Sequence, residues 1–103
     1  MLQFACVGRR RDDGTNTKLT IEVNGVGYDV LLRRASCHDA AYLAQLLALR
    51  MAAAAGIAAP VIRNSNPLVT NQLRGQWKAR KRSMRRYVAM CRKAAAGMTP
   101  VYF

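Results

Sequence analysis

The first third of the chain alternates between apolar and polar residues. In residues 18–23 every second side chain is apolar, which predicts a half-buried strand. Asn24-Gly25 follows and is a strong signal for a hairpin turn, because both residues tolerate positive φ. Residues 27–34 then supply the returning strand, and the apolar run at residues 2–9 supplies a strand before the polar loop of residues 10–17. We therefore predict a three-stranded meander.

The spacing of apolar residues becomes helical after residue 35. Ser36 is a good N-cap, and Asp39 can complete a capping box with it. Gly56 is expected to end this helix. The alanine-rich stretch at residues 51–55 has two interpretations: it packs closely on the sheet, or it is exposed and contacts a partner. The apolar side chains at helical spacing are Tyr42, Leu43, Leu46, Leu47 and Met51.

A short strand and a second helix follow. Residues 57–63 form an apolar run typical of a buried strand parallel to the first, although Pro60 predicts an irregular start or a bulge. Asn66-Pro67 begins a helix that reaches Gly75, because Asn is a good N-cap and Pro favours the first helical position.

A third helix is expected after a basic segment, with Ser83 as its cap and Gly97 at its end. Its apolar stripe is Met84, Tyr87, Val88 and Cys91, and residues 99–103 are a candidate final strand. The order β-β-β-α-β-α-α-(β) indicates an α/β fold, with a mixed sheet of an antiparallel meander plus parallel strands and flanking helices. A length of 103 residues fits one domain, residues 1–103.

The charge of the chain points to polyanionic partners. Seventeen Lys and Arg against five Asp and Glu give a net charge of +12. Each cation that neutralises a phosphate releases a counterion, so nucleic acid is the expected partner. No apolar run approaches the roughly 18 residues that a membrane helix needs. No basic segment carries the bulky apolar residues of a membrane-surface helix, so we expect no membrane partner.

The cysteines and the single histidine do not form a zinc-binding pattern. Cys6, Cys37 and Cys91 are odd in number and far apart, and His38 stands alone beside Cys37. We expect these cysteines to be small buried hydrophobes in a reducing, intracellular compartment, which includes an organellar matrix. No signal peptide is expected, because Arg9-Arg10-Arg11 follows the short apolar stretch rather than preceding it.

Basic residues gather in the second half of the chain. Nine of the 17 cations fall within residues 74–93, and Trp77 lies among them. The charges can form a phosphate-binding surface or a merely solvated helix face. Trp77 can pack on the domain or stack on an exposed base. The nine cations are Arg74, Lys78, Arg80, Lys81, Arg82, Arg85, Arg86, Arg92 and Lys93.

The stretch from Ala35 to Arg82 resembles a known family. The strings SCHDAAYLAQLLAL and VIRNSNPLVTNQLRGQWKAR are similar to ribonuclease H domains of the short bacterial, archaeal and retroelement type. Those domains read T-N-N-x-A-E-Y at the first helix and S-D-S-x-L-V-x-x-Q-L-x-G-x-W/Y-K-x-K after the fourth strand. The matching positions are Tyr42, Gly56, Leu68, Val69, Gln72, Leu73, Gly75, Trp77 and Lys78. The resemblance covers about half of the chain and implies a ribonuclease H-like fold.

The acidic positions of that family are not acidic in this sequence. The resemblance implies two divalent metals held by about four carboxylates. Ala41 stands at the position of the helix Glu and Ser65 at that of the Asp after the fourth strand. Residues 2–9 contain no acid, and the chain ends at Phe103, before the late Asp, so its C-terminal end is expected to be truncated relative to the family. A rival register places Asp13-Gly14 at the first Asp-Gly of the family.

We therefore expect a catalytically degenerate domain without catalytic or metal-binding residues. Magnesium wants several oxygen ligands, and a pair of ions needs several carboxylates to offset the repulsion between them. No cofactor is expected, and Mg²⁺ would be one only if the chain were a nuclease.

The resemblance also implies contacts with nucleic acid. Cys37 and His38 occupy the positions of a polar pair that touches the minor groove of an RNA/DNA hybrid. Residues 64–66 (Asn-Ser-Asn) replace an acidic tripeptide and can either hold a backbone or serve as cap and turn residues. Arg9-Arg10-Arg11 is either a second phosphate contact or a solvated loop. The candidate binding residues are His38, Asn66, Arg74, Trp77, Lys78, Arg80, Lys81, Arg82, Arg85 and Arg86.

Three functions remain open at this point. The first is a non-catalytic module that binds RNA or an RNA/DNA hybrid through its basic C-terminal half. Such a module would suit a ribonucleoprotein assembly, or equally a remnant domain of a retroelement or phage protein. The second is a metal-dependent ribonuclease, completed by carboxylates from a partner subunit. The third is a structural protein that docks on another chain through a sheet edge or the alanine-rich helix.

Overall fold

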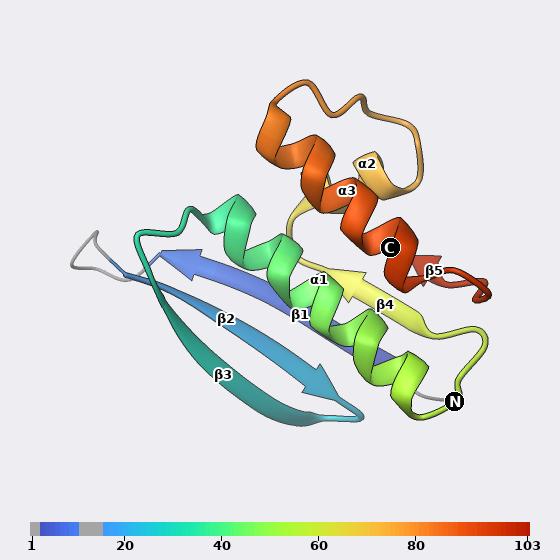
Figure 1. Ribbon diagram of the computed structural model, residues 1–103. Coiled ribbons are helices and arrows are strands. Elements are labelled where there is room, and N and C mark those ends of the chain that lie inside the picture. The colour runs from blue at the N-terminus through green and yellow to red at the C-terminus, as the bar shows by residue number, and fades with distance from the viewer. Residues whose placement is uncertain (1–2, 11–15) are drawn as a thin grey trace.

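The computed structural model describes residues 3–10 and 16–103, which form one five-stranded sheet and three helices (Figure 1). The elements are β1 (Gln3–Arg10), β2 (Asn16–Val23), β3 (Val26–Arg33), α1 (Cys37–Ala54), β4 (Val61–Asn64), α2 (Pro67–Leu73), α3 (Arg82–Ala94) and β5 (Val101–Tyr102). The described part of the chain contains no helix long and apolar enough to cross a membrane.

The sheet has the strand order β3-β2-β1-β4-β5. The first three strands pair antiparallel, while β4 pairs parallel with β1, and β5 pairs parallel with β4. Asn24 and Gly25 turn the hairpin with φ angles of 51° and 87°, as their sequence predicts. The mixed sheet and the order of elements confirm the predicted fold class.

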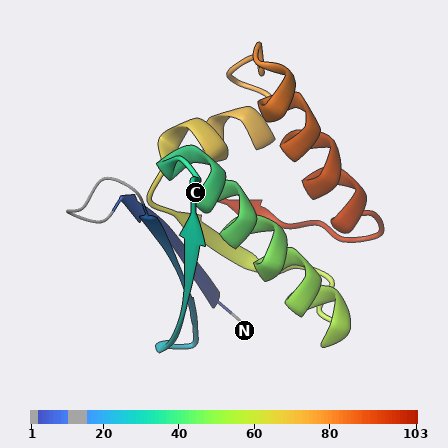
Figure 2. The same cartoon turned by 60° about the vertical axis from the view of Figure 1, so that its left-hand side comes forward.

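The helices build the core on one face of the sheet (Figure 2). The first helix, α1, packs across β1 and β2, and α3 packs against α1. The rings of Tyr42 and Tyr87 stack between these helices, with centroids 5.1 Å apart and planes only 4° from parallel. The Tyr42 hydroxyl donates a hydrogen bond to Gln72 Oε1, which ties α2 to the same core. Large core side chains are Phe4, Leu19, Ile21, Tyr42, Leu49, Ile62 and Val69.

Gly8 allows α1 to approach β1 closely. A Cβ atom at this position would lie 2.7 Å from the backbone nitrogen of Ala41 and 2.7 Å from the carbonyl oxygen of Cys37. Both are backbone atoms of a regular helix and cannot move aside cheaply. The small residue therefore sets the distance between the strand and the first turns of α1.

Both predicted helix starts at Ser36 and Asn66 are confirmed. The Ser36 side chain accepts a hydrogen bond from the Asp39 backbone, and Asp39 returns the bond, which completes the capping box. Asn66 caps α2 by accepting a bond from Leu68 N, with Pro67 next to it. Gly56 has a φ of 71° and follows the C-cap of α1.

The start of α3 differs from the prediction. Its N-cap is Lys81 rather than Ser83, and no side chain caps it. The first helical bond runs from Arg85 N to Lys81 O, so Ser83 lies within the first turn. A serine cap contributes about 1 kcal/mol, and this contribution is not used here. Met84, in the first turn, is buried in the core.

Two other elements are shorter than their predicted runs. Strand β4 begins at Val61, directly after Pro60, because proline has no N–H for the ladder. Strand β5 comprises only Val101 and Tyr102. In the alanine-rich end of α1, Ala52 is buried in the core, while Met51 and residues 53–55 are exposed. Contact of the exposed residues with a partner stays a prediction.

Candidate nucleic-acid interface

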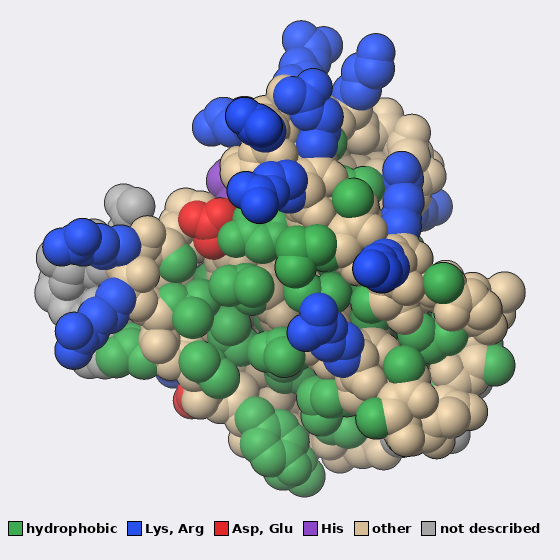
Figure 3. Space-filling model, in the orientation of Figure 1, with side chains coloured by type: hydrophobic (Ala, Val, Ile, Leu, Met, Phe, Trp, Pro, Cys, Tyr) green, Lys and Arg blue, Asp and Glu red, His purple; other side chains and the backbone are tan. Residues whose placement is uncertain are grey.

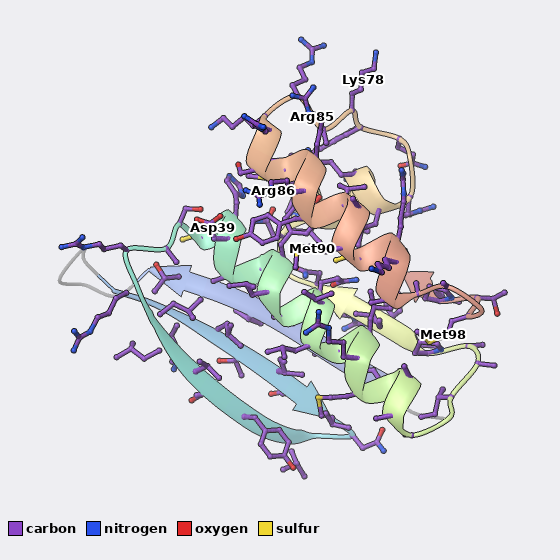
Figure 4. The ribbon with its side chains drawn as sticks, in the orientation of Figure 1. Asp39, Lys78, Arg85, Arg86, Met90 and Met98 are labelled. Carbon is purple, nitrogen blue, oxygen red and sulfur yellow. The ribbon has the colours of Figure 1, made fainter. Side chains whose placement is uncertain are left out.

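Exposed cations cover the end of the molecule formed by the α2–α3 segment (Figure 3). Lys78 and Arg85 point outward from this end, while Arg86 lies further along α3 (Figure 4). All of these residues are exposed, so their charges are available to a partner: Arg74, Lys78, Arg80, Lys81, Arg82, Arg85 and Arg86.

One hollow brings the start of α1 together with the basic loop. It has a volume of about 270 Å³ and is lined by His38 from α1 and by Lys78, Arg80 and Lys81 from the segment before α3. Leu68, Gln72 and Met84 complete its wall. His38 is thus placed beside three cations that lie about 40 residues later in the chain.

His38 also contacts the cap of α2. Its Nδ1 atom lies 2.8 Å from Nδ2 of Asn66. An amide nitrogen only donates, so in this arrangement Nδ1 of the imidazole accepts, and the ring proton is assigned to Nε2. Asn66 Oδ1 meanwhile accepts from Leu68 N at 3.0 Å. Asn66 therefore caps α2 and also orients the His38 ring beside Lys78, Arg80 and Lys81.

Asp39 lies in the first turn of α1, next to His38 (Figure 4). Partial burial tends to raise the pKa of its carboxyl group, but hydrogen bonds from Ser36 and Tyr87 and the neighbouring His38 together hold that pKa below its usual value. The Ser36 N–H and hydroxyl each donate to Asp39 Oδ2 at 2.9 Å. The Asp39 carboxylate is therefore held by Ser36 at the cap of α1 and by Tyr87 of α3.

A second hollow, of about 580 Å³, lies between the α2–α3 loop and α3. Trp77, Lys78, Arg85 and Arg92 are among its lining residues. The Trp77 side chain is 49% exposed, so it is neither a core residue nor fully free. The loop is anchored by Asn71, whose carbonyl accepts hydrogen bonds from the backbone N–H groups of residues 76 and 77.

The structure separates Arg74 from the other predicted residues. Arg74 lines a different hollow together with Leu73 and residues 100–103 near β5. Sequence reasoning also left Arg92, Gln72 and Gln76 off the candidate list, although all three line the hollow of Trp77. A signal for Arg92 was available, because it lies seven residues after Arg85 and so shares a helix face with it.

The positions at which the family has metal-binding acids, Ala41 and Ser65, lie close together at the junction of β1, β4 and α1. Ser65 N donates to the carbonyl of Cys6 at 3.0 Å, and Asn64 Nδ2 donates to the carbonyl of Ala41 at 3.1 Å. Ala41 is fully buried and Ser65 is exposed. In β1 the residues next to this junction are Val7 and Gly8. Asp12 and Asp13, and with them the rival register, lie outside the described residues.

Asn64 fills this junction with amide hydrogen bonds. Its Nδ2 also donates to Gln45 Oε1 at 2.8 Å, and its Oδ1 accepts from Asn66 N at 2.9 Å. Asn64 and Asn66 therefore act as turn and cap residues here. Across the described part of the chain, no three His, Cys, Asp or Glu side chains gather into a group that could hold a metal ion.

Two of the three cysteines lie in the core. Burial raises the pKa of Cys6 to about 12, with a smaller contribution from Cys91, and burial raises the pKa of Cys91 to about 12 as well. Cys37 is partly buried at the start of α1, and all three thiols are free. Cys6 and Cys91 thus behave as the buried hydrophobes that the sequence predicts.

Solved structures show which fold this is. The chain is similar to ribonuclease H1 from Halobacterium salinarum, with a TM-score of 0.78, 22% identity, and coverage of 98% of this chain and 81% of that chain. It is also similar to the N-terminal ribonuclease H domain of a Mycobacterium tuberculosis protein, solved as a fusion protein with maltose-binding protein (TM-score 0.82, 15% identity, 100% and 81% coverage). A third match is LC11 ribonuclease H1 in complex with an RNA/DNA hybrid (TM-score 0.78, 14% identity, 100% and 85% coverage).

These likenesses establish the ribonuclease H fold for this chain. No family model matches the sequence. No curated protein matches it either.

Proposed function

We propose that this chain is a non-catalytic nucleic-acid-binding module that holds the backbone of RNA or of an RNA/DNA hybrid. The observation that carries the proposal is the hollow in which His38 meets Lys78, Arg80 and Lys81. Residues from two distant parts of the chain form one basic surface there. The hybrid bound by LC11 ribonuclease H1, which shares the fold, supports this choice of partner.

The chemistry of the surface suits a phosphate backbone. Exposed Lys and Arg side chains neutralise phosphates and release counterions, which gives affinity without sequence reading. The His38 ring and the Asn66 amide at the margin of the surface can exchange hydrogen bonds with a ribose 2′-hydroxyl. This pair provides a reason to prefer RNA or a hybrid over DNA.

We also propose that this chain does not cleave the nucleic acid that it binds. Ala41, Ser65, Val7 and Gly8 surround the junction where the resemblance places metal-binding acids, and none of them carries an oxygen ligand of carboxylate type. The three free thiols fit a reducing compartment. We place the module in an intracellular ribonucleoprotein assembly, for which an organellar matrix is one setting.

Fluorescence anisotropy with labelled hybrid, RNA duplex and DNA duplex tests the binding. Affinity should fall steeply from about 50 to about 300 mM salt. The triple variant Lys78→Ala, Arg80→Ala, Lys81→Ala should bind more weakly and reduce the salt slope by about one for each lost phosphate contact. Salt-independent binding, or none, would overturn the proposal.

A matched control removes the same charge elsewhere. Lys18, Arg50 and Arg63 are exposed and lie outside the basic surface. The triple variant Lys18→Ala, Arg50→Ala, Arg63→Ala has the same net charge as the first variant. It should keep most of the affinity, whereas an equal loss in both variants would show that net charge alone drives binding.

Incubation of the protein with labelled hybrid and Mg²⁺ or Mn²⁺ tests whether the chain lacks nuclease activity. The expected result is intact substrate. Cleavage that Asp13→Asn abolishes would show instead that the chain is a ribonuclease whose first metal-binding acid is Asp13.

A further inference from the structure

Strand β3 is an unprotected edge of the sheet. Within the described strands it pairs only with β2, and its burial pattern is exposed at every position except Leu32. The side chains of Val26, Tyr28, Val30 and Leu31 are 57%, 55%, 43% and 49% exposed. Edge strands usually carry Lys, Pro or a bulge that blocks further pairing. The sequence VGYDVLLR of β3 has no Lys or Pro, and its register with β2 is unbroken. Its two charged residues, Asp29 and Arg33, have opposite signs.

The apolar surface continues onto α1. Tyr28 and Val30 pair with Ile21 and Leu19, which are buried beneath α1, so they lie on the helix-covered face of the sheet. The helix lies over β1 and β2 and leaves this side of β3 open (Figures 1 and 2). Leu47 and Met51 of α1 are each 38% exposed. Hydrophobic side chains gather over α1 and the adjoining strands in Figure 3.

The free edge of β3 has a defined set of backbone groups. In a two-residue hairpin closed by Val23 and Val26, alternate residues starting at Val26 bond to the partner strand. The residues between them, which are Gly27, Asp29, Leu31 and Arg33, therefore direct their N–H and C=O groups outward. An added antiparallel strand must pair with these four residues.

The charges of β3 favour a second copy of the same strand. If two β3 strands pair antiparallel around Leu31, Asp29 of each lies opposite Arg33 of the other, and Val30 lies opposite Leu32. A dyad at Asp29 would place two carboxylates together. A dyad at Val30 would place Asp29 opposite Leu31. Of these three registers, only the one centred on Leu31 pairs Asp29 with Arg33 at two places and puts apolar pairs between them.

We infer that two copies of this chain associate through β3 in this register and form a two-fold dimer with a continuous sheet. Each copy contributes its five strands. Tyr28 and Val30 then lie next to the seam, and part of their exposed apolar area is removed from water. The α2–α3 segment, which carries the exposed cations, lies away from β3 in Figure 1, so these cations stay accessible. This inference is independent of the proposed nucleic-acid binding.

Sedimentation equilibrium of the nucleic-acid-free chain tests the dimer. A monomer has a mass of 11.4 kDa, so the expected species has twice that mass. Leu31→Lys should produce a monomer, because it places two ammonium groups at the dyad. The matched control is Val101→Lys, which changes a 51% exposed residue at the other edge of the sheet. It should leave the dimer intact.

Complementation by mixing tests the register. Asp29→Arg alone places arginines opposite each other, and Arg33→Asp alone places carboxylates opposite each other, so each variant should weaken self-association at least about tenfold. In an equimolar mixture, the arginine introduced by the first substitution faces the aspartate introduced by the second. The other pair of the mixed dimer keeps its native Asp29 and Arg33, so the dimer should return. Circular dichroism confirms that each variant is folded.

Three results would overturn the inference. The first is a wild-type chain that stays monomeric up to about 200 µM. The second is a dimer that survives Leu31→Lys, or that Val101→Lys disrupts equally, since either would place the interface elsewhere. The third is a mixture of folded Asp29→Arg and Arg33→Asp chains that remains monomeric, which would exclude this register and favour a different protein as the natural cover of β3.

Discussion

The imidazole Nδ1 of His38 lies 2.8 Å from the amide Nδ2 of Asn66, which links the first turn of α1 to the N-cap of α2. This contact joins the edge of the basic surface to the end of β4. It also allows the local role of Asn66 to be separated from its role in binding.

The variant Asn66→Asp separates these roles. An aspartate is as good an N-cap as asparagine, and its charge is favourable at a helix N-terminus, so the melting temperature should be unchanged or higher. The same charge repels phosphate, so binding of a hybrid should weaken several-fold at low salt. Anisotropy and thermal unfolding measure the two effects. Unchanged affinity would show that no phosphate approaches this cap.

Gly8→Ala should destabilise the fold strongly. The added methyl group would lie 2.7 Å from backbone atoms of α1, and overpacking of this kind costs about 1–3 kcal/mol. Gly27→Ala is the control, because the nearest atom to its Cβ is 3.8 Å away in the flexible side chain of Glu22. Urea unfolding compares the two. Equal, small effects would mean that α1 does not approach β1 as closely as described.

Asp39 should make stability depend on pH in the acid range. Its pKa in the folded chain is below the usual 3.8, so its contribution is present above that value and is lost as the pH falls through the lower, folded value. Asp39→Asn should therefore be less stable than wild type near pH 6, and the gap should narrow below about pH 3. Urea unfolding at both pH values measures this difference.

The control for this prediction is Glu22→Gln. The Glu22 side chain is exposed on β2, and Glu22 lies outside the outer edge of β3. Exposed surface charges contribute about 0–1 kcal/mol, so the unfolding free energy should change little at either pH. A gap for Asp39→Asn that stays constant with pH would contradict the assigned role of its carboxylate.

The three thiols should differ in reactivity. Cys6 and Cys91 are buried with pKa values raised to about 12, so at pH 8 neither is a thiolate to a useful extent. A disulfide reagent should therefore modify one thiol of the native chain quickly, at Cys37, and three after denaturation. Cys37→Ser should abolish the fast phase. Three fast thiols in the native chain would contradict the described core.

Much of the architecture was predictable from short-range patterns. The hairpin turn at Asn24-Gly25, the capping box of Ser36 and Asp39, and the cap at Asn66 follow from preferences of residues within a few positions of each other. These preferences are strong enough to set the order of the elements. The start of α3 was predicted wrongly at Ser83, where the cap preference did not prevail.

The sequence predicted which basic residues the candidate site contains, but not how they are arranged in space. The concentration of cations after residue 74 is visible in the chain, but only the fold places His38 beside Lys78, Arg80 and Lys81 and moves Arg74 to a separate hollow. Gln72 lines both hollows, whereas the sequence singles it out only as a position that matches the family motif.

The sequence by itself therefore determined the strands, the turns, two of the helix starts and the sign of the charge, because each depends on neighbours along the chain. The tertiary structure alone decided which cations share a surface, that α1 packs closely against Gly8, and that β3 keeps an open apolar edge. Those features depend on contacts between residues tens of positions apart, where packing in three dimensions outweighs local preference.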